Sequence, residues 1–339
     1  MRNCTAPVNA RLLKIRQRLR WKYNDFLFQN GMGKHLLRNR PGGRILVYHG
    51  IDQHGSREFN TRFISQQEFD QQVAWMKTHF HLVSLDAYYA GAFAKDRLTV
   101  ALTFDDGYAN NLKYALPVLE KYEVPAAFFV TGIRHTGQNI LWPDFLDLAT
   151  PLLQRPLVVD GETFVKDKRG ELVARSSRKK LKHLAKESDY LFILKMLNAF
   201  PMEADPREKT EWEDYWRQMT AAELRELAAS PLVTMGSHSF LHTSLGEIPI
   251  DNAREEMLAS KNYLETVLSK SITALAFPDG SYTREVVETA REMGFEQQLA
   301  VDFKYPEDQK DPALRTRLGL HPFLSWNNQV AIILKGSYY

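Results

Sequence analysis

The sequence predicts an α/β protein built around a parallel β-sheet or barrel. Three observations support this class. Short apolar, β-branched segments alternate with segments of helical periodicity. Several of the apolar segments are followed by acidic residues or histidines. In α/β folds, functional residues lie at the carboxyl ends of the strands. The length of 339 residues also suffices for one large core or two medium ones.

The composition excludes several classes of protein. A net charge of +3 gives no indication of nucleic acid as a partner. Cys4 is the one cysteine, so neither an intrachain disulfide nor a zinc site made of thiolates can form. We find no apolar run long enough to cross a bilayer and no signal peptide, because basic residues interrupt the first apolar positions. We therefore expect a cytoplasmic location.

Residues 1–40 form a basic extension that differs from the rest of the chain. Their single acid is Asp25, and the positions of helical spacing carry apolar side chains on one face: Leu12, Ile15, Leu19, Tyr23 and Phe26. A basic amphipathic helix is typical of peripheral contact with a membrane surface, here the inner membrane. The alternative is a helix packed on the domain with its basic face in water.

After a break at Pro41–Gly43, the expected strands and helices follow in alternation. Residues 44–48 form a strand that ends at His49, residues 69–80 a helix, 98–104 a strand, 110–122 a helix and 125–130 a strand. Later come a helix at 220–229 with Thr220 and Glu223 as its capping box, and a strand at 232–236. A helix at 253–268 capped by Asp251, a strand at 272–277, a helix at 283–293 and a strand at 297–301 complete the pattern, and 326–339 form a C-terminal tail.

Residues 140–215 interrupt this alternation, and we interpret them as an insertion on one βα loop. They contain a basic run and a long helical pattern from Lys179 to Phe200. Such a segment can shape the mouth of an active site, or it can be a structural elaboration without substrate contact.

Asp105 and Asp106 stand where the buried strand 98–104 ends and a helix begins. Neighbouring residues that leave a strand point in different directions, so one carboxylate can ligate a metal while the other faces a water molecule. Asp-Asp-Gly107 on its own would also fit a simple polar turn.

His238 and His242 lie four residues apart, just after another strand. On a helical turn, residues at this spacing share one face and can hold one metal ion. Two histidines and one aspartate make a three-ligand site with open positions, the arrangement of catalytic zinc. The other aspartate can then accept a proton from water. His49, at the end of a further strand, can supply a proton to a leaving group, although a hydrogen-bonded core histidine is the alternative.

Thr103–Gly107 and Gly236–His242 together resemble the polysaccharide deacetylase family with the NodB-homology domain, carbohydrate esterase family 4. The resemblance covers most of residues 44–320 apart from the insertion. It implies a distorted (β/α) barrel of about seven units over residues 41–325. It also implies that Asp105 is the general base, and that Asp106, His238 and His242 bind a divalent metal, usually Zn²⁺.

Two features depart from the family pattern. The third motif usually has an arginine that orients the base, but this chain has Ala276–Ser281 without one. The final motif supplies the general acid, for which His321 is a candidate. However, Leu46–Ile51 resembles the permuted branch typified by poly-N-acetylglucosamine deacetylases, where the acid histidine stands near the N-terminus. We therefore prefer His49 as the acid, and we expect further substrate contacts from Tyr108, Trp142, Pro278, Asp279 and His321.

The resemblance implies hydrolysis of the N-acetyl group of an amino sugar in a polysaccharide, an oligosaccharide or a glycan precursor, for example a lipid-linked one. Two other functions stay open at this point. One is a non-catalytic glycan-binding module on the same scaffold, and the other is an amidase for a non-sugar amide.

Overall fold

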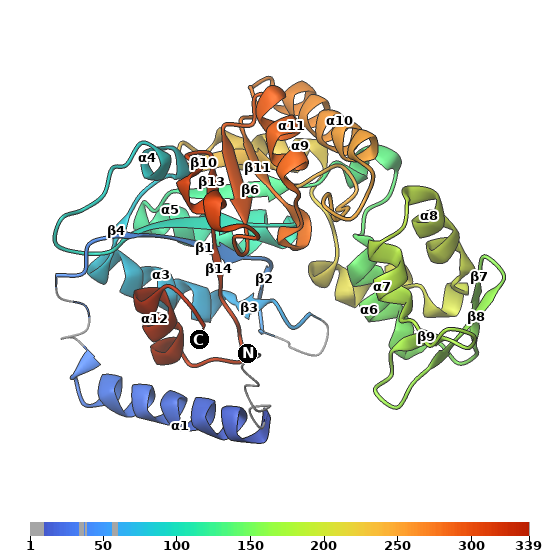
Figure 1. The fold of residues 1–339 in the computed structure, drawn as a ribbon, viewed down its shortest axis with the longest axis horizontal. Coiled ribbons are helices and arrows are strands. Elements are labelled where there is room, and N and C mark those ends of the chain that lie inside the picture. Colours follow the sequence, from blue (N-terminus) through green and yellow to red (C-terminus); the bar gives the residue numbers. More distant parts are fainter. Residues whose placement is uncertain (1–9, 34–36, 38, 56–59, 339) are drawn as a thin grey trace, which may run out of the picture.

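The computed structural model describes residues 10–33, 37, 39–55 and 60–338. Its centre is one parallel sheet, which confirms the predicted α/β class (Figure 1). The strands are β1 (Gly43–Tyr48), β4 (His81–Leu82), β5 (Thr99–Phe104), β6 (Ala126–Val130), β10 (Val233–Ser237), β11 (Ala274–Ala276), β12 (Gln297–Ala300), β13 (Leu314–Thr316) and β14 (Leu318–Gly319). They lie in the order β13-β12-β11-β10-β6-β5-β1-β14, with β4 also paired to β5. A short pair, β2 (Ile51–Asp52) and β3 (Ile64–Ser65), lies beside this sheet.

The two ends of the sheet are joined by consecutive residues of the chain. β13 pairs with β12, with Leu314 opposite Gln298, whereas β14 pairs with β1, with Leu318 opposite Leu46. The only residue between β13 and β14 is Arg317. The segment 314–319 therefore nearly closes the sheet into a distorted (β/α) barrel, as expected, and Arg317 marks the point of closure.

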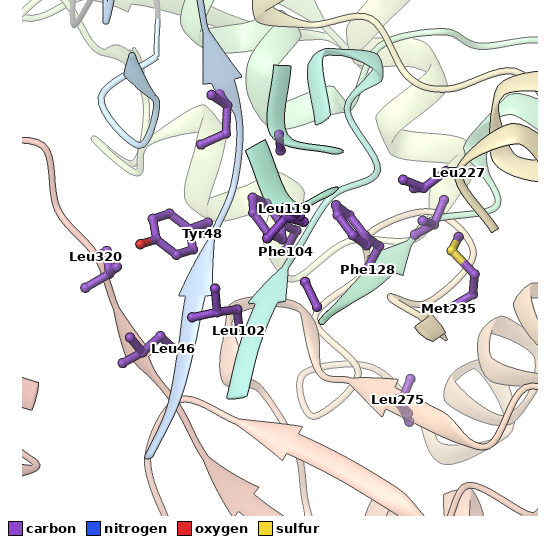
Figure 2. Packing of buried hydrophobic residues seen from close by; sticks show 14 of the residues in the cluster. Leu46, Tyr48, Leu102, Phe104, Leu119, Phe128, Leu227, Met235, Leu275 and Leu320 are labelled. Carbon is purple, nitrogen blue, oxygen red and sulfur yellow. The ribbon is translucent and has the colours of Figure 1, made fainter. Parts of the chain in front are cut away.

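Helices cover the outside of the sheet and bury the apolar side chains that point outward from its strands. They are α3 (Gln66–His79), α5 (Leu116–Tyr122), α9 (Ala221–Ala229), α10 (Ile250–Leu268), α11 (Arg284–Glu292) and α12 (Trp326–Lys335). The short helix α4 (Leu85–Tyr89) packs against the other face of the strands, where Leu85 and Tyr88 join a cluster with Ile45 and Ala101. Figure 2 shows the aromatic centre of the outer layer, where the Phe104 ring stacks on Tyr48 and on Phe128, with centroids 5.3 and 4.7 Å apart. Tyr48 and Phe104 are the last residues of β1 and β5, and Phe128 is the middle residue of β6. Their packing therefore fixes the ends of the strands that His49 and Asp105 follow.

Of the two helix caps predicted from the sequence, the structure confirms one. Thr220 and Glu223 form the expected capping box at the start of α9. The predicted cap at Asp251 is wrong, because α10 already begins at Ile250 after Pro249. Asp251 instead lies in the first turn, where its charge interacts favourably with the helix dipole. A π-helix (Asn111–Ala115) precedes α5, and short 3₁₀ helices lie at Ile133–Thr136, Pro278–Gly280 and Pro306–Lys310.

The insertion is a unit of mixed structure with an apolar core of its own. It comprises α6 (Trp142–Leu152), an antiparallel sheet of β7 (Leu157–Val159), β8 (Glu162–Lys166) and β9 (Leu172–Ala174), then α7 (Leu181–Lys186), α8 (Tyr190–Ala199) and 3₁₀ turns at Met202–Ala204, Pro206–Glu208 and Thr210–Tyr215. The prediction of one helical stretch from Lys179 to Phe200 is wrong. Asp189 starts a new helix there, since its side chain accepts a hydrogen bond from the Phe192 amide at 2.9 Å.

The N-terminal helix α1 (Ala10–Gln29) packs along α12, which lies between α1 and the barrel (Figure 1). The predicted C-terminal tail thus contains a regular helix. Residues 1–9 of the basic extension lie outside the described residues, as do the side chains of Leu12 and Ile15. In the described part of the chain, we find no helix with the length and apolarity that a membrane span requires.

Candidate active site

The two adjacent aspartates point to different partners, as expected at the end of a strand. The Asp105 carboxylate accepts two hydrogen bonds from the guanidinium of Arg317, each of 2.7 Å. The backbone then turns through the left-handed region at Asp106 (φ 77°) and Gly107 (φ 80°), which directs Asp106 toward two histidines. A Cβ on Gly107 would lie 2.8 Å from Cγ1 of Val130, so the turn requires glycine for both conformation and space.

Asp106, His238 and His242 form a buried cluster whose ligand atoms all lie within 4.8 Å of one another. Nε2 of His242 and Nε2 of His238 are 3.2 and 3.5 Å from Oδ1 of Asp106. Nδ1 of His238 lies 2.8 Å from the Ala276 carbonyl oxygen, to which only a protonated Nδ1 can donate. The lone pair of neutral His238 is therefore on Nε2 and directed toward the cluster.

The donor set fits a divalent cation such as Zn²⁺. One carboxylate and two imidazoles are its usual ligands, and three protein ligands leave a position for substrate. Within the described residues, neither oxygen of Asp106 accepts a hydrogen bond of ordinary geometry, although both are buried. Buried carboxylate oxygens normally have donors, so a bound cation would satisfy an otherwise unpaired group.

The histidine segment is a loop, and the predicted helical turn is wrong. Ser239 and His242 both have φ near 59°, which no α-helix contains. Glu256 of α10 holds the loop by accepting hydrogen bonds from the amides of Phe240 (3.0 Å) and Leu241 (2.9 Å). Because the loop coils through these left-handed residues, the two histidines still reach one point.

The charges of the cluster keep both aspartates ionised. Burial alone would raise the pKa of Asp106, but Arg62 and the two histidines hold it well below its ordinary value. Burial likewise opposes ionisation of Asp105, yet Arg317 lowers the pKa of that carboxyl below the usual range. Burial would lower the pKa of His242, but Asp106 raises it above the ordinary value. Asp106 is thus available as an anionic ligand and Asp105 as a proton acceptor.

Arg317 is the functional residue that the sequence interpretation missed. The third motif lacks its arginine, and the structure supplies a guanidinium to Asp105 from the closure of the barrel instead. Arg317 is 3% exposed and its Nη1 also lies 3.2 Å from the Thr103 hydroxyl. One signal in the sequence could have found it. Arg317 directly precedes the short apolar segment Leu318–Leu320, and an arginine beside a buried strand is rarely buried without a charge partner.

The structure separates the two candidate acids. Burial lowers the pKa of His49 to about 4, with further effects of Arg62, Asp106, Asp105 and Arg317, so the charges of the site act on this ring. The pKa of His321 is lowered by burial alone, without a contribution from any described charged group, and its ring lies beside Tyr338 at 5.4 Å. Their catalytic roles stay predictions, but only His49 shares the electrostatic environment of the aspartates.

A second network, partly buried and not indicated by the sequence, ties the insertion to the cluster. Arg62 lies 3.5 Å from Oδ2 of Asp106 and forms an ion pair of 3.0 Å with Asp144 of α6. Asp144 also accepts hydrogen bonds from the Tyr108 hydroxyl (2.6 Å) and the Asn60 amide (3.2 Å). Burial, with only partial compensation by Arg62, raises the pKa of Asp144 to about 6.

A cavity of about 460 Å³ lies between the barrel and the insertion, a size typical of small-molecule sites. His242, Arg62 and Asp279 line it from the barrel side, and residues of α6, α7 and β9 line it from the insertion. Lys186 of α7 crosses to Asp279 in an ion pair of 2.8 Å. The insertion therefore forms one wall of a cavity that His242 of the cluster lines, which agrees with the first of its two interpretations.

The expected substrate contacts have different positions. Asp279 lines the cavity, and its own hydrogen bond comes from the Ser244 hydroxyl at 2.9 Å. Tyr108, Trp142 and Pro278 are buried and do not line it. Tyr108 packs edge-on against Phe63, and Trp142 belongs to the core of the insertion, so both serve packing in this structure. His321 does not line the cavity either.

This fold and this site define a class of protein: parallel (β/α) barrels that carry an Asp-His-His cluster where their strands end. The chain belongs to the polysaccharide deacetylase family, because the sequence model of that family matches residues 94–183 and 201–298. The match confirms the resemblance read from the two motifs.

Individual relatives agree with this family. The poly-beta-1,6-N-acetyl-D-glucosamine N-deacetylase of Staphylococcus aureus is 32% identical over 88 residues, which are 25% of this chain and 30% of the relative. The alignment thus spans less than a third of that protein. Among solved structures, the Streptococcus pyogenes deacetylase PplD in complex with acetate has a TM-score of 0.55 at 18% identity, covering 86% of this chain and 97% of PplD. IcaB from Ammonifex degensii has a TM-score of 0.53 at 20% identity, covering 87% and 97%. The structural likeness shows a shared fold.

Proposed function

We propose that this protein is a metal-dependent deacetylase that hydrolyses the N-acetyl group of an amino sugar in a polysaccharide, an oligosaccharide or a glycan precursor. The observation that carries the proposal is the buried cluster of Asp106, His238 and His242, with Asp105 only 3.9 Å from Nε2 of His238. Membership of the polysaccharide deacetylase family and the alignment to an N-acetylglucosamine deacetylase support the amino-sugar substrate.

Asp106, His238 and His242 would hold the ion, and the nitrogen and oxygen donors favour Zn²⁺. When bound, a divalent cation polarises the acetamido carbonyl and lowers the pKa of a water molecule. The residues of the chain then divide the proton transfers between them. Asp105, ionised and fixed in orientation by Arg317, accepts the proton that the attacking water loses.

His49 donates a proton to the sugar nitrogen when the carbon–nitrogen bond breaks, so that a neutral amine and acetate leave. Its low pKa means that the ring is uncharged at neutral pH, and the proton that it delivers has to reach it during the reaction. The proton that Asp105 takes from the attacking water balances this donation, because it passes through His49 to the sugar nitrogen. The products are then the amine and acetic acid, which loses its own proton to solvent as acetate, and both residues return to their starting states. Lys186 on the insertion wall of the cavity and Asp279 on its barrel wall bound the space for the sugar next to the acetamido group.

Release of acetate from N-acetylated sugars tests this proposal. The protein loaded with Zn²⁺ should release acetate from at least one of three substrate sets: chitooligosaccharides and β-1,6-linked N-acetylglucosamine oligomers, lipid-linked N-acetylhexosamines, and nucleotide sugars. Asp105→Asn is the matched control, because it keeps the shape of the side chain and removes the proton acceptor. Stoichiometric metal without any acetate release, together with measurable glycan binding, would favour a non-catalytic module. Release of another acid from a non-sugar amide would favour the amidase.

A cytoplasmic location, which we expected from the sequence, stays a proposal. Fractionation of cells with an antibody to the protein tests it.

A further inference from the structure

We infer that α1 is a docking helix for an anionic lipid surface, which would hold the barrel at a membrane. The inference is independent of the proposed catalytic function. It rests on the way in which α1 is turned: the side that packs on α12 carries Trp21, Asn24 and Asp25, and a stripe of exposed apolar side chains faces outward.

The inner side of α1 is held on α12 by hydrogen bonds. Nδ2 of Asn24 donates to Oδ1 of Asn328 at 3.0 Å, and the carboxylate of Asp25 accepts from the Ser325 hydroxyl at 2.6 Å and from the Asn328 amide at 3.1 Å. The same Asn328 amide donates to the Trp21 carbonyl oxygen at 3.2 Å. These contacts fix the rotation of the helix about its axis, so the direction of its other face is determined.

The outer side presents large apolar side chains to water. Leu19, Tyr23 and Phe26 have spacings of four and three residues, so they form one stripe, and they are 62%, 60% and 54% exposed. Most amphipathic helices of a globular protein bury such a stripe against the core. Here the stripe is exposed, and Trp21, Asn24 and Asp25 lie on the side that packs on α12. Figure 1 shows α1 as the outermost helix on its side of the molecule. The alternative of a helix packed on the domain with its basic face in water agrees with the packing on α12, and the structure adds an apolar stripe that is in water as well.

The charges beside the stripe select the kind of partner. Arg16, Arg18, Arg20 and Lys22 are all exposed. Within the described ranges none of them has an acidic partner, and Arg20 donates a hydrogen bond to the Tyr338 carbonyl oxygen at 2.7 Å. The one acid of the helix, Asp25, is turned toward α12. An apolar stripe flanked by cations matches an anionic phospholipid surface, where the apolar side chains enter the interface and the cations meet phosphate groups. Pairing with α1 of a second copy would instead bring these cations against one another.

Co-sedimentation of the full chain with lipid vesicles tests the inference. The protein should bind vesicles of phosphatidylcholine with about 30 mol% phosphatidylglycerol at low salt, and high salt should release it. It should not bind vesicles of phosphatidylcholine alone. Replacing Leu19, Tyr23 and Phe26 by serine should weaken binding at least about tenfold, since each side chain contributes apolar area to the interface. Replacing Arg16, Arg18 and Lys22 by glutamine should weaken binding by about fivefold for each cation removed.

A matched control carries serine at Val158, Leu191 and Leu258, which are 57%, 61% and 47% exposed on the insertion and on α10. This control should bind like the wild type. Circular dichroism and urea unfolding establish that each variant is folded, and neither readout depends on catalysis. Equal binding by the apolar variant and the wild type would overturn the inference, and so would equal loss in the control. A wild-type dimer that the apolar variant converts to a monomer, without vesicle binding by either, would assign the stripe to a second copy instead.

Discussion

Arg317 gives the sharpest prediction, because it joins the closure of the barrel to the chemistry of the site. Replacement by glutamine removes both hydrogen bonds to Asp105 and leaves that carboxylate buried without its charge partner. Breaking a buried ion pair from one side typically costs about 3–5 kcal/mol of unfolding free energy. The cost should be visible in urea unfolding of the metal-free protein.

The catalytic effect of Arg317→Gln follows from the pKa of Asp105. With Arg317 present, the folded-state pKa lies below the ordinary value, so the carboxylate is ionised across the neutral range. Burial raises the pKa of Asp105, and Arg317 counteracts this effect. Removal of Arg317 should therefore raise the pKa. The acid limb of the kcat/KM profile should therefore move to higher pH. Loss of orientation adds to this effect, and since general base catalysis is worth about 10²–10⁴ in rate, kcat/KM at neutral pH should fall by at least about 10².

Two variants and one measurement make this reasoning refutable. Arg315→Gln is the matched control, because the Arg315 guanidinium bonds to the carbonyl oxygens of Asp311 and Leu314 and not to Asp105. Arg317→Lys keeps the charge but not the two-pronged geometry, so it should recover only part of the activity. Zinc stoichiometry, measured by plasma emission spectroscopy, should stay at the wild-type value in all three. A wild-type pH profile in Arg317→Gln would refute the role, and loss of metal there would place Arg317 in support of the ligands.

Three other predictions follow from the same geometry. His238→Ala and His242→Ala should each lose most bound metal, whereas Asp105→Asn should keep it and lose turnover; equal metal loss in Asp105→Asn would mean that base and ligand are exchanged. His49→Ala should keep metal and lower turnover by about 10²–10⁴ for amide substrates but much less for an activated ester, and His321→Ala should be mild; the opposite ranking would identify His321 as the acid. Although burial acts in the opposite direction, Arg217 and Thr220 lower the pKa of Glu223 from 4.5 to about 2. The stabilisation is thus fully present above pH 4.5 and lost as pH falls toward 2, so Glu223→Gln should cost about 1 kcal/mol in urea unfolding at pH 7, and the difference from wild type should disappear near pH 2.

The parts of the fold that local physics determines could be predicted from the sequence. The strand 98–104 and the helix 220–229 have strong periodicity and clear ends, and the structure places β5 and α9 there within a residue. The failures arose where one residue outweighed a longer pattern. Asp189 divided a continuous apolar periodicity into α7 and α8, and Pro249 started α10 ahead of the expected cap.

The site was predictable to the extent that its residues follow strands. The sequence places four of its residues directly after predicted strands, and the structure brings them together: Asp105, Asp106, His238 and His242. Arg62, Asp144 and Arg317 could not be assigned in this way, because each forms an ion pair with a residue at least 44 positions away. Arg62 and Asp144 also come from a loop and from the insertion, where sequence patterns carry the least information about direction.

The parallel sheet explains why the acid candidate and the arginine lie beside the base. Tyr48 pairs with Phe104 across β1 and β5, so the residues that follow, His49 and Asp105, leave two neighbouring strands at the same level. β14 lies on the other side of β1, and Arg317 directly precedes it. Three consecutive strands in space, β5, β1 and β14, thus bring together Asp105, His49 and the guanidinium of Arg317, whereas Asp106, His238 and His242 follow β5 and β10. Because β14 pairs with the edge of β1 that β5 leaves free, the segment that closes the barrel can carry the arginine that the third motif lacks.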